Sequence, residues 1–266
     1  MSGLDMDPEG VRRVRAPNPS PLTLDGTNTY VVGRWVVDPG PDDPAHLAAV
    51  RSALPAEGVE GVEGVEGVEG VEGVEGVVLT HGHSDHAGGA ERLGVQVTLP
   101  RDGEVVGPFR AIATPGHSPD SVCLVAGRLA ASTRLGRVRA DRICFTGDTV
   151  LGTGSVFIAP GEGSLSAYLD SLRRLRGLSL DVLCPGHGPY VWDPAAKLDE
   201  YVAHRLSRER RLLEALAEGL RTRDELLDSA WSDAPPELRE FAALSLASHL
   251  EKLAEEGRLP EGVEPA

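Results

Sequence analysis

The sequence predicts an α/β fold followed by a small helical domain, and two observations favour this fold class. Up to residue 193, short apolar strands end on turns that contain glycine. From Pro194 onward, apolar residues recur at the spacing of amphipathic helices. The chain has 266 residues, of which 41% are hydrophobic, so it can bury one large core and a smaller one. We therefore expect an α/β domain over residues 1–193 and a winged-helix-like domain over residues 194–266.

The first elements are a hairpin, a helix and a strand. The segment "GTNTYVVG" leads into a strand, and "RWVVDPG" follows as its hairpin partner. The helix "DPAHLAAVRSAL" and the strand "GVVLT" come next. Between them, residues 58–75 repeat Gly-Val-Glu six times. A period of three fits neither a helix nor a strand, and the repeat lacks the proline of collagen, so we expect a flexible acidic loop.

Helices dominate the later part of the sequence. Ser164 is placed to cap a covering helix over residues 164–175. In the C-terminal part, residues 197–219 form a long amphipathic pattern, and "TRDELLDSAW" opens with a Thr-x-x-Glu capping box. A third helix begins after the prolines at 235–236 and ends at Gly257. Three helices with a short extended end are typical of a winged-helix-like appendage.

Composition excludes several classes of protein. The formal net charge of −15 argues against non-specific attraction to nucleic acid, although it permits a local basic groove. No apolar run is long enough to span a bilayer, and the N-terminus does not resemble a signal peptide, so we expect no membrane contact and a cytoplasmic location. Cys123, Cys144 and Cys184 are widely spaced among apolar residues, which favours reduced, buried thiols.

The strongest chemical signal is a set of seven potential metal ligands. The stretch "THGHSDHAGG" follows a strand and precedes a short helix expected over residues 87–94. Three further apolar strands end in the same way, in "ATPGH", "FTGD" and "CPGH". The ligand-type residues at these strand ends are His81, His83, Asp85, His86, His117, Asp148 and His187. Seven nitrogen and carboxylate ligands are enough for two metal ions, and they suit zinc, with manganese or iron as alternatives.

The pattern HxHxDH, followed by His, Asp and His, resembles that of the metallo-β-lactamase superfamily. The resemblance implies a four-layer αββα sandwich with two Zn²⁺ ions at one edge of the paired sheets. It also implies that His81, His83 and His117 hold the first metal, and that Asp85, His86 and His187 hold the second, with Asp148 bridging both. Asp85 and Asp148 are the expected catalytic carboxylates. Asp38, by contrast, is interpreted as a buttress of the metal loop. The best-known zinc β-lactamases have cysteine where this chain has Asp148, which argues against antibiotic hydrolysis.

A narrower resemblance suggests the substrate. The segments "GTNTYVV", "TPGHS" and "PGHGP", together with the helical tail, resemble the branch that contains the mitochondrial β-lactamase-like endoribonuclease. This branch implies a two-metal hydrolase in which a metal-bridging hydroxide cleaves RNA phosphodiesters. The sequence departs from the ribonuclease at Gly82, where that enzyme has a bulky aromatic residue.

Other functions remain open from the sequence alone. A thioester or small-ester hydrolase of the glyoxalase II type has a motif at least as similar to "THGHSDH". A mononuclear-iron persulfide oxygenase would use His81, His117 and Asp148. A non-catalytic binding protein is disfavoured, because all seven ligand positions are filled. The tail carries ten basic and sixteen acidic residues, so a structural cap or a homodimer contact competes with nucleic-acid binding as its role.

Overall fold

The computed structural model describes residues 6–55, 73–127 and 138–265. They fall into two compact units. The first unit comprises residues 1–113, 120–154 and 179–194, and the second comprises residues 114–119, 155–178 and 195–266. The domain boundary expected after residue 193 stays a prediction. The expected flexible loop over residues 58–75 lies, except for its last three residues, outside the described part of the chain.

The first unit contains two mixed five-stranded sheets. The first sheet has the order β1-β2-β3-β4-β5, with β1 to β3 antiparallel and β3 to β5 parallel. Its strands are β1 (Val11–Arg15), β2 (Asn28–Val32), β3 (Trp35–Val37), β4 (Gly76–Val78) and β5 (Val97–Thr98). The crossover from β3 to β4 contains α1 (Pro44–Ala53), which begins with proline and is capped by the Asp43 side chain. The predicted hairpin and helix are therefore confirmed.

The second sheet has the order β10-β9-β8-β7-β6. Strands β6 to β9 are antiparallel neighbours, whereas β9 and β10 run parallel. The strands are β6 (Val105–Val106), β7 (Phe109–Ala113), β8 (Val122–Ala126), β9 (Ile143–Gly147) and β10 (Val182–Pro185). Every residue of β9 and β10 is buried, as expected for a parallel pair covered on both faces.

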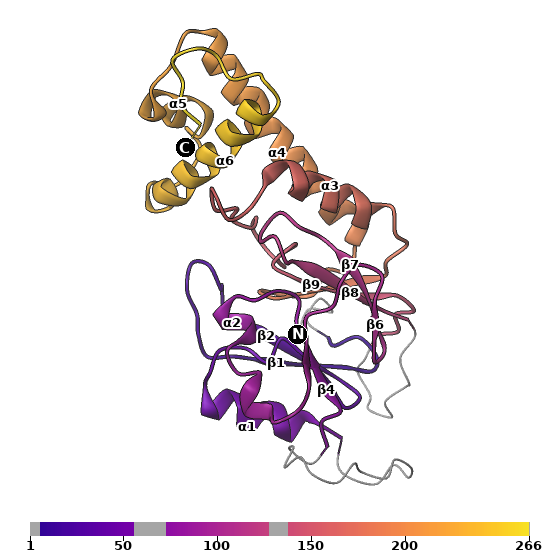
Figure 1. Cartoon of the computed structure of the whole chain (residues 1–266). Coiled ribbons are helices and arrows are strands. Elements are labelled where there is room, and N and C mark those ends of the chain that lie inside the picture. The colour runs from indigo at the N-terminus through magenta and orange to yellow at the C-terminus, as the bar shows by residue number, and fades with distance from the viewer. Residues whose placement is uncertain (1–5, 56–72, 128–137, 266) are drawn as a thin grey trace. The chain divides into compact units, whose positions relative to one another are not determined.

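The two sheets pack face to face, and α1 covers the outer face of the first sheet (Figure 1). Tyr30 of the first sheet meets Phe145 of the second edge to face, with ring centroids 5.2 Å apart. Each such buried large side chain contributes about 2–3 kcal/mol to folding. The Tyr30 hydroxyl donates to the carbonyl of Pro185 at 2.7 Å, which satisfies its polar end. The three cysteines are buried and form no disulfide, as predicted.

The second unit is helical. Its helices are α3 (Leu165–Arg176), α4 (Pro194–Ala217), α5 (Arg223–Ala230) and α6 (Arg239–Glu255), with a short 3₁₀ turn at Pro236–Leu238. The first residue of α4, Pro194, still belongs to the first unit. The Ser164 cap and the capping box of Thr222 and Glu225 are both present, as the sequence predicted. Leucines of α4, α5 and α6 form a separate core around Trp231. In the part of the chain that the structure describes, no helix is both long and apolar enough to cross a membrane.

Candidate metal centre

The ends of three strands bring the ligand-type residues of the first unit together. Strand β4 leads to His81, β9 leads to Asp148, and β10 leads to His187. The register of β10 against β9 shifts between Cys184 and Pro185, and such an irregularity redirects the chain just before His187. A rigid pair of sheets therefore holds the loops from which these side chains project.

The loop after β4 differs from the sequence expectation in one respect. Its helical turn, α2 (Ser84–Ala87), begins earlier than expected and contains Asp85 and His86 themselves. The carbonyl of His83 accepts hydrogen bonds from the backbone amides of both His86 and Ala87. Beyond it, a Cβ atom on Gly89 would lie 2.8 Å from a methyl group of Leu47, so a larger residue there would require the Leu47 side chain to shift.

The six ligand-type side chains of the first unit form close pairs, in which the ligand atoms are near enough to share a metal ion. His81 Nε2 is 3.1 Å from His83 Nδ1, and His86 Nε2 is 3.3 Å from His187 Nε2. Asp148 Oδ1 lies 3.3 Å from His86 Nε2 and 3.2 Å from His187 Nε2. Asp85 Oδ2 lies 3.6 Å and 3.4 Å from the same two nitrogens. In two triads of this unit, all the ligand atoms lie within 4.8 Å of one another. One triad is His81, His86 and Asp148, and the other is Asp85, His86 and His187.

These distances fit a metal site. Ligand atoms bound tetrahedrally at the usual zinc distances are about 3.3–3.4 Å apart. The observed separations of 3.1 to 3.6 Å bracket that value. The donor set of imidazole nitrogens and carboxylates also suits zinc, manganese or iron. The residues present therefore fit the divalent metals that the motif implies.

In the cluster, the outward nitrogen of each buried histidine is held by an acceptor. Thr80 Oγ1 lies 3.0 Å from His81 Nδ1, and its own hydroxyl donates to Asp38, so it accepts from the imidazole. Asp38 Oδ2 accepts from His86 Nδ1 at 3.0 Å, and the carbonyl of Gly26 lies 3.4 Å from His187 Nδ1. Each ring thereby carries its proton on Nδ1 and presents Nε2 to the cluster. Such an arrangement is typical of metal-binding histidines.

Charge compensation within the cluster shifts several pKa values. Burial raises the pKa of Asp85, but the hydrogen bond to His187 and the charge of His86 outweigh it and lower the pKa to about 2. Burial lowers the pKa of His187, but hydrogen bonds with Asp148 and Asp85 raise it to about 9. In the same way, the pKa of Asp148 is well below its ordinary value and that of His86 well above it. Without metal, protons on the histidines therefore balance the carboxylates.

His117 belongs to the second unit, although its loop connects β7 and β8 of the first. The His117 Nδ1 atom lies 2.9 Å from the carbonyl of Phe157, which can only accept, so Nδ1 carries the proton. The backbone amide of Ser164 donates to the carbonyl of Gly116, and the hydroxyl of Ser171 donates to that of Pro115. The loop is thus fixed against α3.

Several supporting residues were less visible in the sequence. Asp38 acts as the expected buttress, because its carboxylate accepts from the backbone amide of Thr80 as well as from His86. Asn28 donates to the carbonyls of Pro185 and Gly188, which hold the His187 loop. Gly186 was missed, although a side chain there would lie 2.5 Å from His86 and 2.7 Å from Asp148. The only sequence signal for it was the run "PGHGP".

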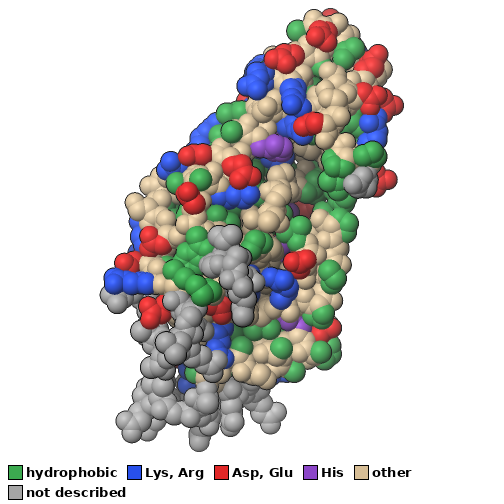
Figure 2. All heavy atoms as spheres, turned by 180° about the vertical axis from the view of Figure 1, so that it is seen from behind, with side chains coloured by type: hydrophobic (Ala, Val, Ile, Leu, Met, Phe, Trp, Pro, Cys, Tyr) green, Lys and Arg blue, Asp and Glu red, His purple; other side chains and the backbone are tan. Residues whose placement is uncertain are grey.

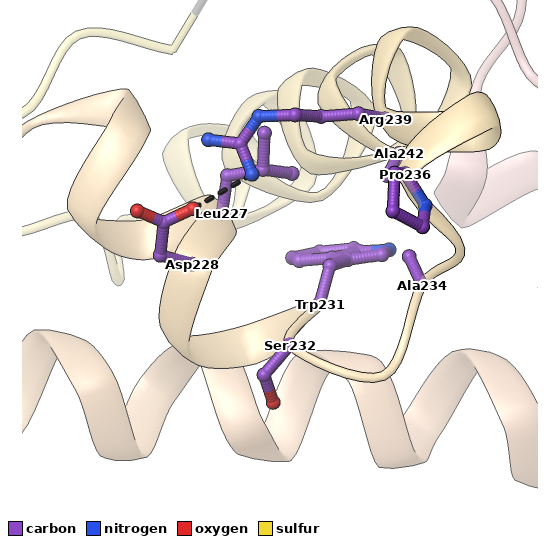
Figure 3. A pocket seen from close by; sticks show the side chains of 8 residues that line it. All are labelled: Leu227, Asp228, Trp231, Ser232, Ala234, Pro236, Arg239 and Ala242. Atoms are coloured by element: carbon purple, nitrogen blue, oxygen red, sulfur yellow. Dashed lines mark ion pairs between the residues drawn. The ribbon is translucent and has the colours of Figure 1, made fainter.

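A separate cavity of about 310 Å³ lies in the C-terminal helices. Figure 3 shows Asp228 and Arg239 pointing toward one another above the Trp231 ring, and their closest atoms are 2.7 Å apart. The lining residues are Leu227, Asp228, Trp231, Ser232, Ala234, Pro236, Arg239 and Ala242. Its only carboxylate is already paired with an arginine, and its lining contains no histidine or cysteine. This cavity therefore lacks the groups for metal-assisted hydrolysis.

Comparison with known proteins supports the interpretation of the fold. Residues 22–96 match the family described as the metallo-beta-lactamase superfamily, and residues 222–261 match the beta-lactamase associated winged helix domain. The lactamase-like protein adaB of Aspergillus niger is 30% identical over 97% of this chain and 84% of its own length. A beta-lactamase-like protein 2 homolog of Caenorhabditis elegans is 28% identical over 94% and 85%.

Solved structures agree on the fold. A metallo-beta-lactamase family protein from Thermus thermophilus has a TM-score of 0.68 at 22% identity, covering 93% of this chain and 94% of that one. The fold and site thus define a protein of the class of metal-dependent hydrolases built on two mixed sheets flanked by helices, with a C-terminal winged helix. The chain belongs to the metallo-β-lactamase superfamily.

Proposed function

We propose that this protein is a two-metal hydrolase that cleaves phosphodiester bonds of RNA. The observation that carries the hydrolase assignment is the cluster of three buried histidines whose Nδ1 atoms are held by acceptors and whose Nε2 atoms converge with two carboxylates. Buried groups of opposite charge add little net stability, because their desolvation offsets their attraction, so stability alone does not account for the cluster.

The proposed ligands follow the family motif. His81, His83 and His117 hold the first metal, whereas Asp85, His86 and His187 hold the second. Asp148 would bridge the two, consistent with the triad in which one of its oxygens lies within 4.8 Å of ligand nitrogens of both His81 and His86. We propose two Zn²⁺ ions, with Mn²⁺ or iron as alternatives. When bound, two such cations supply a hydroxide near neutral pH and polarise the attacked oxygen.

The two carboxylates have different surroundings and therefore different roles. The Asp148 side chain is 12% exposed and lies between two histidines, so it orients the site. The Asp85 side chain is 29% exposed, and its low pKa keeps it ionised at neutral pH. Asp85 is the more exposed of the two, so it is the carboxylate that can contact and orient a water entering the site, while Asp38 keeps the ring of His86 in place.

RNA is proposed as the substrate from the resemblance to the endoribonuclease branch. The match to the associated winged helix and the likeness to a beta-lactamase-like protein 2 homolog support this choice. The C-terminal helices do not favour RNA contact, because their net charge is negative, and positive and negative side chains are intermingled on the face shown in Figure 2. We therefore assign RNA contact to the α/β domain.

Cleavage of a labelled single-stranded RNA by zinc- or manganese-loaded protein tests the proposal. Asp148→Ala, purified identically, controls for contaminating nuclease, because it removes the shared ligand. We expect cleavage that disappears in this variant. Cleavage of equal rate in both proteins would contradict the assignment. Hydrolysis of thioesters without RNA cleavage would keep the two-metal hydrolase and replace its substrate, and one iron per chain with oxygen consumption would replace the reaction as well.

A further inference from the structure

We propose that helices α4 and α6 position His117 for metal binding, and that Arg205 and Ser248 are the residues through which they act. The inference rests on the proposed function, in which His117 is a ligand of the first metal. It gives the C-terminal helices a part in building the metal site, in addition to forming their own core. His117, residues 155–158, Arg205 and Ser248 all belong to the second unit.

The link begins at the imidazole of His117. Its Nδ1 atom donates to the carbonyl of Phe157 at 2.9 Å. This hydrogen bond fixes both the tautomer and the rotation of the ring, so that Nε2 is the nitrogen able to coordinate a metal. The position of one backbone carbonyl therefore decides how His117 is presented.

That carbonyl belongs to a segment held by side chains. Residues 155–158 form neither helix nor strand. Three consecutive carbonyls of the segment nevertheless each accept a side-chain hydrogen bond, from Arg205 at Val156, from His117 at Phe157, and from Ser248 at Ile158. The Ser248 bond measures 2.7 Å. Arg205 of α4 and Ser248 of α6 thus bind the carbonyls immediately before and after the one that holds His117.

The ring of Phe157 gives the same segment a third attachment. It packs edge to face against Phe241 of α6, with centroids 6.2 Å apart. Val156 and Ile158 are buried on either side of it. The segment is therefore fixed by packing as well as by hydrogen bonds, and its conformation depends on α6 in both respects.

Arg205 is difficult to explain by stability alone. Its side chain is buried, with the residue only 4% exposed, and no carboxylate pairs with it among the described residues. It donates instead to the carbonyl of Val156 and to Ser245 Oγ, and lies over the ring of Tyr168 at 5.6 Å. Burying a cation without a counter-charge is costly, so packing alone does not favour an arginine at this position. Holding the 155–158 segment accounts for its presence.

A packing role and a positioning role predict different results for Arg205→Met and Ser248→Ala. If these residues only stabilise the fold, each variant lowers the melting temperature of the metal-free protein and leaves metal affinity unchanged. If they position His117, metal affinity falls by more than any change in melting temperature explains. Arg205→Met is informative because methionine fills similar volume without charge.

Zinc stoichiometry and affinity are measured by competition with a chromophoric chelator. The visible spectrum of the cobalt-substituted protein is recorded as a second readout. We expect Arg205→Met and Ser248→Ala each to bind one of two equivalents about tenfold more weakly, with altered cobalt bands. Arg210→Met and Ser207→Ala make the same chemical changes on α4 away from residues 155–158 and are expected to behave like the wild type. Unchanged affinity and spectra in both test variants would overturn the proposal.

His117→Ala separates this inference from the proposed function. If it leaves both equivalents bound with wild-type affinity, the ligand assignment itself is wrong. If it weakens one equivalent while Arg205→Met and Ser248→Ala do not, the assignment stands and the positioning by α4 and α6 is refuted. Ser248→Ala alone decides the matter if Arg205→Met fails to fold.

Discussion

Replacing Asp38 by asparagine tests how the metal loop is held. The carboxylate is 2% exposed and accepts three hydrogen bonds, from the Thr80 amide at 2.8 Å, the Thr80 hydroxyl at 2.7 Å and His86 Nδ1 at 3.0 Å. Asp38 has a φ of 48°, a conformation that asparagine tolerates, so the backbone remains unstrained. Asp38→Asn therefore isolates the effect of the carboxylate.

An asparagine amide cannot serve all three donors. If the asparagine oxygen faces His86, the asparagine NH₂ group opposes the amide of Thr80. If the side-chain amide is flipped, the NH₂ group opposes His86 instead. The flipped amide favours the His86 tautomer that carries its proton on Nε2, the coordinating atom. Losing one charge-assisted bond and leaving a buried donor unmet costs about 2–4 kcal/mol of unfolding free energy. Metal affinity is expected to fall about 10- to 100-fold.

Urea unfolding of the metal-free protein and zinc competition measure these two quantities. Asp42→Asn is the matched control, because Asp42 pairs with Arg92 at the exposed surface, where such a pair contributes about 0–1 kcal/mol. If Asp38→Asn matched Asp42→Asn in both stability and zinc affinity, the interpretation of Asp38 as the buttress of His86 would be refuted.

Three further predictions concern other parts of the chain. Gly186→Ala places a methyl group 2.5 Å from His86, so zinc affinity is expected to fall at least tenfold, whereas Gly127→Ala, which meets nothing within 4 Å, leaves a zinc titration unchanged. Burial, then the charges of Arg205 and Lys252, lower the pKa of His249 to about 3 from 6.5. Below pH 6.5 the unfolded chain gains a proton on His249 and the folded chain does not, so the free energy of unfolding falls by about 2 kcal/mol between pH 6.5 and 5. Urea unfolding of His249→Leu should show that this part of the pH dependence is lost. Thr222→Ala removes the cap of α5 and is expected to cost about 1 kcal/mol in the same assay, and no change would show that the capping box is unimportant.

Much of the fold could be predicted because local chemistry and tertiary structure agree. Ser164 and Thr222 are caps in the sequence and in the structure. The strands that lead to Asp148 and His187 were recognisable because buried parallel strands are continuous apolar runs that end in glycine-containing turns. The start of α2 was missed, since its four residues are too few for helical periodicity to appear.

The ligand types were visible in the sequence, but most of their supports were not. Thr80 and Asp38 are 42 residues apart, and Gly26 is 161 residues from His187. A backbone carbonyl such as that of Gly26 or Phe157 has no signature in a sequence, because every residue has one. Only the structure can show which carbonyl fixes which histidine.

The distribution of these supports has a consequence for the order of folding and metal binding. The acceptors for His81, His86 and His187 come from Thr80, Asp38 and Gly26, which are placed by β2, β3 and β4 of the first sheet. Asp148 and His187 themselves follow strands of the second sheet. The ligands can therefore converge only after both sheets have packed around Tyr30 and Phe145, so we expect the sheets' apolar core to form before metal binding. In this respect the protein differs from small zinc domains, whose folding free energy is supplied by the metal.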